Sequence, residues 1–354
     1  MNRDEILDLI RRNKTVLGAD LSGIDLAGAD LTGGRFEKVN FQGADLSGVN
    51  IRKTGLRKCD FAGARLDGTD LSNVDLRKMN FAGASFQKVR LDRTLFQGAD
   101  LRKADFSDAH LGWSLMQNAQ LDGAVFTGAV FEKMIMSHAS MNGADLSGAD
   151  LTKVVFLDTK LEGARFQGAK LFKVLLSDCK LAGQDFHGMS IQQVNFAGSD
   201  LSNADFSGAN LRMCHFMNAD LSGANLEGAD AQDAMFLGAK FLKTRLAGAN
   251  LYRAYFGEGD LSQADFTGAN LENAAFTRAK CRAARFVNGK CSYADFSHAD
   301  LTGADFSGAR LYMALLHRSV VDGAVWDRAD RTLIRLENKE MAEAEDWTPQ
   351  DTKR

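Results

Sequence analysis

The segment ADLSGANLEG, residues 219–228, consists of two consecutive five-residue units of the same design. Each unit has a small residue, then Asp or Asn, then Leu, and ends with a polar residue and a glycine. The same spacing continues in both directions, with a residue of this central type at every fifth position from Leu21 to Trp326 and no insertion or deletion. The central residue is apolar throughout, except for the small residues Ala231, Cys281 and Cys291.

The other positions of the repeat are also restricted in type. Of the 24 phenylalanines, all except Phe172 are central residues, and most of the 34 glycines stand two residues after a centre. A period of five fits neither an amphipathic helix, with a period of 3.6, nor a strand, with a period of 2. It requires a short extended stretch and a corner in every repeat, and glycine readily adopts the backbone dihedrals of corners. The pattern therefore predicts a solenoid.

The units ADLSG, ADFSG and ANLEG resemble those of the pentapeptide-repeat family over about residues 16–330. The resemblance implies an all-β solenoid, a right-handed quadrilateral β-helix with four repeats per coil and the central and small residues pointing inward. About 15 coils at the usual strand spacing would form a rod on the order of 70 Å long. Residues 20 apart would then stack in columns, so the chemistry of each face can be examined column by column.

Both ends of such a β-helix expose unpaired strand edges, and we expect short helical caps there. Residues 1–15 are predicted to contain the N-terminal capping helix, with Asn2 as its N-cap and Glu5 three residues later. Residues 16–330 are predicted to be one β-helical domain. The series breaks at Arg331, so residues 331–354 are predicted to form a C-terminal helix, starting at Asp330, and a frayed tail, WTPQDTKR.

Composition excludes several classes of protein. The formal net charge of −3 is near neutral, so it indicates neither a nucleic-acid-binding field nor a strongly anionic surface. The opening MNRDEILDLIRRNK has no apolar core of a secretory signal, and no apolar run approaches 18 residues. We therefore expect a cytoplasmic protein without a membrane partner. The cysteines lack clustered spacing and occupy inward repeat positions, where we expect buried free thiols and no zinc site: Cys59, Cys179, Cys214, Cys281 and Cys291.

No motif for catalysis or cofactor binding is present, since GxSxG, P-loop, HExxH and dinucleotide fingerprints are all missing. His298 and His317 fall on neighbouring columns one coil apart, but no Asp or Cys at ligand spacing joins them, and we expect no metal. Outward aspartates such as Asp200 and Asp220 are expected to bond backbone amides at turns. A densely packed solenoid also lacks the pocket that catalysis needs. We predict no enzyme activity, no catalytic residue and no cofactor.

One outward column departs from the polar character of the other three. It carries an apolar residue in five successive coils, and these residues form what we call the apolar stripe: Leu95, Leu115, Ile135, Val155 and Leu175. The neighbouring corner column, called the basic corner, consists of Arg93, Trp113, Lys133, Lys153 and Lys173. Contiguous apolar patches usually mark interaction sites, and Trp and Arg are enriched there. We predict a partner-binding surface; alternatively, the stripe is a ladder that strengthens pairing between coils.

The predicted function is that of a non-enzymatic protein-interaction scaffold. By family analogy it is an adaptor or chaperone of a bacterial secretion system such as type VI, whose partner is a toxin or a secretion component. One alternative is a DNA-mimicking rod that binds DNA gyrase, in quinolone protection or gyrase inhibition, although this requires an anionic rod. Another is nucleic-acid binding with steep salt dependence, through Lys38, Arg57, Lys58, Arg77, Lys78 and Trp113. Homodimerisation through an end of the rod is also open.

Overall fold

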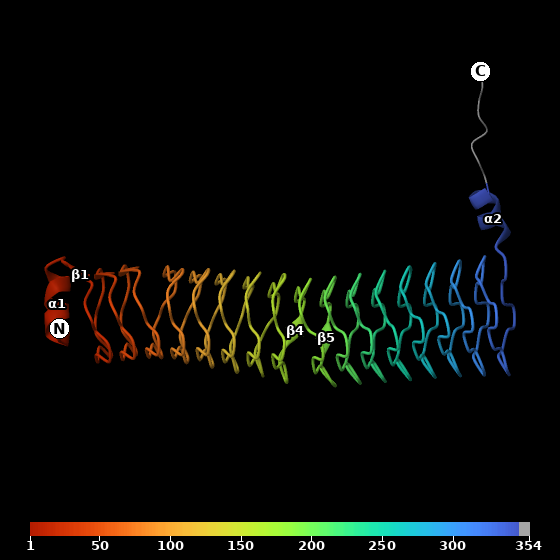
Figure 1. Ribbon diagram of the computed structural model, residues 1–354, viewed down its shortest axis with the longest axis horizontal. Helices are drawn as coiled ribbons and strands as arrows, with labels where there is room; N and C mark the ends of the chain where they lie inside the picture. The colour runs from red at the N-terminus through yellow and green to blue at the C-terminus, as the bar shows by residue number, and fades with distance from the viewer. Residues whose placement is uncertain (347–354) are drawn as a thin grey trace, which may run out of the picture. The chain divides into compact units, whose positions relative to one another are not determined.

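The computed structural model describes residues 1–346, so the predicted tail over 347–354 lies outside the described residues. The chain divides into two compact units, Met1–Leu201 and a second unit that begins at Ser202. Each unit is a stack of β-helical coils (Figure 1). The repeat pattern had predicted a single β-helical domain, because nothing in its spacing marks a boundary near residue 201.

Each coil contains 20 residues, which confirms the predicted four repeats per coil. Parallel bridges join residues 20 apart, such as Asp25 with Asp45 in the first unit and Tyr255 with Ala275 in the second. Most of these contacts are single-residue bridges. Longer strands form one parallel sheet in the order β1–β2–β3 and a second of β4 and β5. Their bounds are β1 Thr15–Leu17, β2 Arg35–Glu37, β3 Gly55–Arg57, β4 Leu171–Phe172 and β5 Ile191–Gln192.

Central residues fill the interior of the coils, as predicted. The rings of Phe266 and Phe286 stack at 5.0 Å between centroids, and Phe286 stacks on Phe306 at 4.6 Å. In the first unit Phe41 and Phe61 stack in the same way, at 5.0 Å. Because stacked centres are 20 residues apart, the regular spacing of the sequence produces continuous columns of buried rings. Full burial of such large side chains is the main stabilising contribution to the fold.

The corners of the coils explain the glycine pattern. Gly223 has φ of 70° and stands two residues after a central residue, in the left-handed region that glycine adopts without strain. Many equivalent corners hold other residue types in the same conformation, including Trp113 with φ of 60° and Lys153 with φ of 62°. A residue with a side chain is rarer in this region and its conformation costs about 1 kcal/mol. Exposed side chains at the corner columns therefore reduce the stability of the fold slightly.

A helix covers the N-terminal end of the first unit. Helix α1, Arg3–Arg11, begins with a complete capping box, in which Asn2 Oδ1 accepts from the Glu5 N–H and Glu5 Oε2 accepts from the Asn2 N–H, each at 3.0 Å. This confirms the predicted cap. The side chain of Ile6 is fully buried, so the helix packs its apolar face against the first coil.

The predicted start of the C-terminal helix is wrong. Asp330 does not begin a helix: it pairs with Arg310 as the next rung of the ladder, and its Oδ1 accepts from the Thr332 N–H at 3.1 Å. The ladder continues to Arg335, which pairs with Leu315. Helix α2 is Lys339–Asp346. The sequence Asp-x-Thr is compatible with a corner of the repeat and also with the N-cap of a helix. The residue types alone therefore did not distinguish these two structures.

Candidate protein-interaction surface

The five residues of the apolar stripe lie in consecutive rungs of one parallel ladder. Leu95 bridges Leu115, Leu115 bridges Ile135, and the series continues through Val155 to Leu175. The backbone takes part in regular hydrogen bonds between coils, for example from the Phe96 N–H to the Leu115 carbonyl at 2.8 Å. All five side chains point outward and are half-buried by their neighbours in the column. The stripe is therefore a continuous apolar ridge about 20 Å long, at the usual strand spacing.

The basic corner borders the stripe on one side. All five of its residues have left-handed backbone conformations and exposed side chains. Trp113 is 52% exposed, and the Lys133 ammonium lies 4.5 Å from the centroid of its ring, in a cation–π contact. Lys133 also lies 3.4 Å from the Glu132 carboxylate. Arg93 and Lys153 form no ion pair within residues 1–346, so their charges remain available to a partner.

Two further apolar side chains extend the surface. Phe172 is 38% exposed, beside the Lys173 ammonium, which lies 5.2 Å from its ring centroid. Leu157, 37% exposed, lies at the opposite corner of the same face. Phe172 was not among the predicted site residues. The sequence did mark Phe172, because it is the one phenylalanine that is not a central residue of the repeat.

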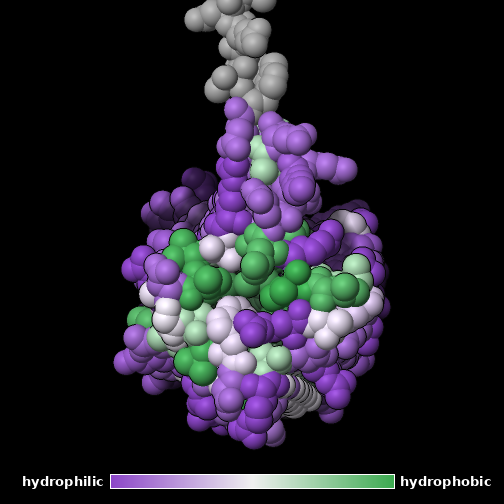
Figure 2. All heavy atoms as spheres, turned by 90° about the vertical axis from the view of Figure 1, so that its right-hand side faces the viewer, coloured by the Kyte–Doolittle hydropathy of each residue, from purple (hydrophilic) through white to green (hydrophobic). Residues whose placement is uncertain are grey.

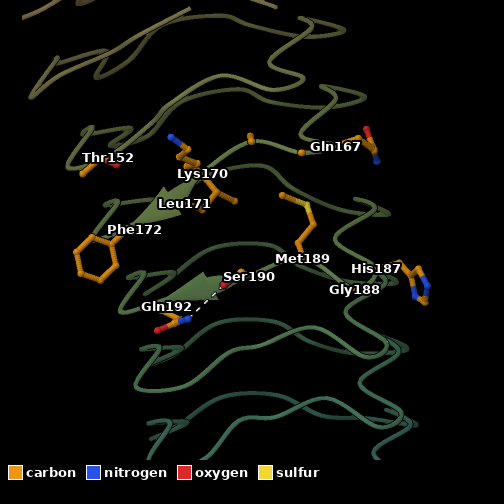
Figure 3. Close-up of a pocket in the computed structure, with 12 residues that line it drawn as sticks. Thr152, Gln167, Lys170, Leu171, Phe172, His187, Gly188, Met189, Ser190 and Gln192 are labelled. Carbon is orange, nitrogen blue, oxygen red and sulfur yellow. Dashed lines mark hydrogen bonds between the residues drawn. The ribbon is translucent and has the colours of Figure 1, made fainter. Parts of the chain in front are cut away.

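A hollow of about 620 Å³ lies around the corner from the stripe, between the coil of Lys170 and the coil of Ser190. Figure 3 shows the Met189 side chain between the two coils and the Phe172 ring pointing away from them. Within the described residues, the Phe166 and Gly168 N–H groups donate no backbone hydrogen bond to the following coil.

A buried glutamine accounts for part of this opening. Gln184 stands at the small inward position that alanine fills elsewhere, and its side-chain amide donates to the Ala164 carbonyl. In the preceding layer the equivalent Ala144 carbonyl accepts from the Arg165 N–H at 2.9 Å. The larger side chain thus replaces a ladder bond with its own, and the coils separate beside it. The densely packed interior predicted from the sequence is therefore interrupted here.

The polar columns consist of self-contained turns, as predicted for outward aspartates. The Asp220 Oδ1 accepts from the Ser222 N–H at 3.0 Å, and the Asp45 Oδ1 accepts from the Ser47 N–H at 2.9 Å. The Ser47 hydroxyl and then its N–H hold the pKa of Asp45 below its usual 3.8. These carboxylates are hydrogen-bonded components of the corners.

The structure brings a third group to the two neighbouring histidines. His298 Nε2 lies 2.9 Å from Glu345 Oε1, and His317 Nε2 lies 3.4 Å from Glu345 Oε2. This group of possible metal ligands was missed because Glu345 comes from α2, outside the repeat. The Asn338 N–H donates to His317 Nδ1 at 3.1 Å, so the neutral ring carries its proton on Nε2, facing the carboxylate. With Arg318 3.1 Å from the same carboxylate, the arrangement is a hydrogen-bonded clasp that holds α2 on the last coils.

All five cysteines are buried and free, as expected from their inward positions. Burial raises the pKa of Cys179 to about 12 and that of Cys291 to about 12. Such thiols are poor nucleophiles at neutral pH. Among the described helices, none has the length and apolar character needed to span a bilayer.

Comparison with known protein families gives extensive matches to pentapeptide repeats. The family described as "Pentapeptide repeats (8 copies)" matches residues 19–57, 59–98, 104–143, 139–178 and 279–318. The family described as "Pentapeptide repeat region" matches residues 189–266 and 209–286. No curated protein sequence matches the chain.

Several solved structures share the repeat at low identity. QnrB1, a plasmid-mediated fluoroquinolone resistance protein, is 19% identical, with 56% of this chain and 94% of that chain covered and a TM-score of 0.35. HetL from Nostoc sp. strain PCC 7120, a pentapeptide repeat protein involved in heterocyst differentiation regulation, is 21% identical, with 93% and 96% covered and a TM-score of 0.18. A thylakoid-lumen pentapeptide repeat protein from Arabidopsis thaliana is 30% identical, with 36% and 69% covered and a TM-score of 0.17.

Proposed function

Because this chain belongs to the pentapeptide-repeat family, we propose that it is a non-enzymatic scaffold that binds another protein through the apolar stripe and the basic corner. The observation that carries the proposal is the continuity of the stripe. Five successive coils present an apolar side chain in this column, whereas the corresponding columns on the other three faces are mostly polar. An apolar ridge beside exposed cations and Trp113 has the composition of an interface centre with a polar rim.

The proposed interface requires a partner of matching chemistry. A complementary surface needs an apolar groove about 20 Å long to cover the stripe. Beside that groove it needs carboxylates opposite Arg93 and Lys153, whose charges have no ion-pair partner in residues 1–346. Trp113 and Phe172 provide flat aromatic surface at the edges of the contact. Pairing between stacked side chains in the ladder contributes to stability as well, and it keeps the stripe rigid before a partner binds.

The partner we propose is a toxin or another component of a bacterial secretion system such as type VI, and the chain would act as its adaptor or chaperone in the cytoplasm. Support for this class of partner comes from the family analogy. Support for a reducing compartment comes from the five free cysteines.

Binding to DNA gyrase by DNA mimicry is the alternative, and the charge pattern argues against it. Mimicry of duplex DNA requires a regular array of negative charge, because that charge dominates how proteins bind DNA. The stripe and its corner carry apolar and cationic side chains instead. Recovery of gyrase with the chain in a binding experiment would therefore support this alternative.

We also propose that a second copy of the chain covers the C-terminal end of the second unit. An open hollow of about 370 Å³ lies there, lined by Leu316, Val321, Trp326, Arg331, Ile334 and Leu336. Figure 2 shows the apolar side chains gathered on this end, beneath α2. Leu336 is 69% exposed, and the ladder beyond Arg335 has no further rung in the described chain. An uncovered apolar strand edge favours pairing with another chain.

The dimer is tested by light scattering after size exclusion. The wild-type chain is expected at twice its formula mass, and Leu336→Glu with Val325→Glu at the formula mass. A matched control, Leu242→Glu, alters an exposed apolar residue on a corner of the same unit and should leave the mass unchanged. A wild-type monomer at micromolar concentration would exclude the dimer.

The scaffold is tested by purifying bound proteins from the native host with wild-type bait and with a Leu115→Glu/Ile135→Glu variant. Loss of one partner in the variant supports the stripe as the interface. Recovery of gyrase with the wild type would favour the alternative function.

A further inference from the structure

The first unit has a second opening, between the coil of Leu56 and the coil of Leu76, that neither the stripe nor the repeat explains. Two adjoining hollows of about 680 and 510 Å³ lie there and share Leu56 and Asp75. We call this opening the N-terminal slot. It lies in the same column as the stripe, since Gly55 and Asp75 precede Leu95, but it contains none of the stripe residues.

The inter-coil hydrogen bonds are missing across the slot. In the layer before it, the Leu31 N–H donates to the Asn50 carbonyl at 2.8 Å, and in the layer after it the Leu76 N–H donates to the Leu95 carbonyl at 2.8 Å. In the slot, four amides of the first coil have no backbone acceptor anywhere in residues 1–346. These are the N–H groups of Ile51, Lys53, Leu56 and Lys58.

The interruption is confined to two faces of the coil. On another face of the same two coils the Arg65 N–H donates to the Ala44 carbonyl at 2.9 Å, so the coils remain joined there. Figure 1 shows these coils, in the orange part of the chain, spread apart along one side. The slot is therefore a wedge with two intact faces behind it.

The joined and open faces differ in the size of their inward side chains. The joined face has the small residues Ala44 and Ala64 at its inward positions, whereas the open face has Thr54 and Val74. Thr54 also turns toward the preceding coil, where its hydroxyl donates to the Leu31 carbonyl at 2.7 Å. The next layer also stacks two β-branched residues, Val74 and Thr94, and there the Leu95 N–H donates to the Val74 carbonyl at 3.0 Å, so side-chain size alone does not open the slot.

The open walls are complementary to a β-strand. One wall presents unpaired N–H groups, and the facing coil presents the carbonyls that these groups would otherwise meet, on Asp70, Ser72, Asp75 and Arg77. Unpaired ladder edges bind added strands, and leaving such groups without partners is costly. An extended chain placed between the walls would accept from the first and donate to the second, as an additional rung.

The rim of the slot is cationic. Exposed basic side chains border it from both coils: Arg52, Lys53, Arg57, Lys58, Arg77 and Lys78. Arg77 pairs with Asp75 at 2.6 Å and Arg57 with Glu37 at 3.6 Å. Lys53, Lys58 and Lys78 form no ion pair within the described part of the chain. The floor is apolar, since Ile51 and Leu56 point into the core.

We propose that the N-terminal slot binds an extended peptide segment of a partner as an added β-strand, with acidic side chains facing the rim and apolar side chains facing the floor. Successive side chains of a strand point to opposite faces, so the recognised segment alternates acidic and apolar residues. The site is independent of the scaffold function, because no stripe residue lines it.

The test measures binding of the peptide fluoresceinyl-Glu-Val-Glu-Val-Glu-amide, labelled at its N-terminus, to the full chain by anisotropy. Lys53→Glu/Lys58→Glu should weaken binding by about tenfold or more, because two attractions become repulsions. The matched control Lys160→Glu/Lys180→Glu changes the same charge on another face of the same unit and should leave binding within about twofold. Leu115→Glu/Ile135→Glu should also bind normally, which separates this site from the stripe.

A second peptide distinguishes strand addition from simple anion binding. N-methylation of alternate amides preserves the charge but removes backbone donors, and it should abolish binding. Equal binding of the methylated peptide, or full competition by polyphosphate or duplex DNA, would overturn the proposal in favour of a general anion site.

A third measurement tests the slot itself. The bound peptide should slow hydrogen exchange at the Lys53 and Leu56 amides of the wild-type chain, because an added strand accepts from these N–H groups. Peptide binding with unchanged exchange at both amides would show that the slot is not the site. Absence of binding to the wild type would overturn the proposal directly.

Discussion

The Lys133 ammonium lies 4.5 Å from the centroid of the Trp113 ring, although the two residues come from successive coils. Both occupy left-handed corners, with φ of 55° and 60°. The repeat thus places a residue with a large side chain where glycine would be conformationally easier, and it does so in every coil of the basic corner.

Trp113→Ala is expected to separate binding from stability. The exposed cation–π contact contributes up to about 1 kcal/mol, so the free energy of unfolding should fall by no more than that. Partner binding should weaken by about 2 kcal/mol, because tryptophan is enriched among the residues that dominate interface energetics. Denaturant unfolding and titration calorimetry with the identified partner measure the two quantities. A large loss of stability with unchanged affinity would contradict the assignment.

Inward and outward substitutions should have opposite effects on folding. Phe206→Asp places an unpaired charge in a fully buried position and should destabilise the fold by more than about 4 kcal/mol. Ile135→Glu changes a half-buried outward residue and should leave the far-ultraviolet circular dichroism unchanged. The reverse result, with Ile135→Glu unfolded and Phe206→Asp folded, would show that inward and outward positions are exchanged.

The cysteines should be inert in the folded protein. Burial raises the pKa of Cys179 to about 12, and that of Cys291 likewise to about 12. Iodoacetamide at pH 8 should therefore modify none of the five thiols under native conditions and all of them in denaturant. Mass spectrometry of the intact chain counts the adducts. Rapid native modification of Cys179 would show that its coil opens or that it is exposed.

Acid should weaken the corners of the coils. Hydroxyl and amide donors of Ser47 and Ser307 hold the pKa of Asp45 and of Asp305 below 3.8 in the folded chain. Since the folded pKa lies below the unfolded value, the stabilisation is present above about pH 4 and is lost as the pH falls through the folded pKa. The melting temperature should fall below pH 4. In Ser47→Ala/Ser307→Ala the pH-dependent part of this fall should be smaller; an unchanged profile would contradict the cause.

Glu345 should hold α2 in place. Glu345→Gln removes the charge that contacts His298, His317 and Arg318, and hydrogen exchange across Lys339–Asp346 should become faster. Glu343→Gln, on the same helix and exposed, is the matched control and should exchange as the wild type does. Equal exchange in the two variants would show that the clasp does not hold the helix.

Most of the fold could be predicted from the period alone. Strict spacing from Leu21 to Trp326 determines which residues stack, so the bridges between Leu95 and Leu115 and the buried phenylalanine columns followed directly. The N-terminal cap was also predictable, because a capping box is a local motif. The start of α2 was not, because Asp330 and Thr332 form the same hydrogen bond in a repeat corner as in a helix cap.

The interruptions of the ladder were harder to predict, because the repeat pattern continues through them unchanged. Thr54 and Val74 face each other across the slot, but Val74 and Thr94 stack in the next layer with the ladder intact, so these residue types do not mark the interruption. Gln184 acts through a hydrogen bond to Ala164 that has no counterpart in the repeat. The contact of Glu345 with the two histidines depends on where α2 folds back, which the repeat does not determine.

The most direct test of the central claim is the affinity of the purified partner for the wild-type chain and for Leu115→Glu/Ile135→Glu, measured side by side. Circular dichroism and melting temperature first establish that the variant is folded. The proposed interface predicts that the variant loses affinity by about a hundredfold, the effect of two disrupted interface residues. Equal affinity in a folded variant would contradict the stripe as the binding surface and leave it as a ladder between coils.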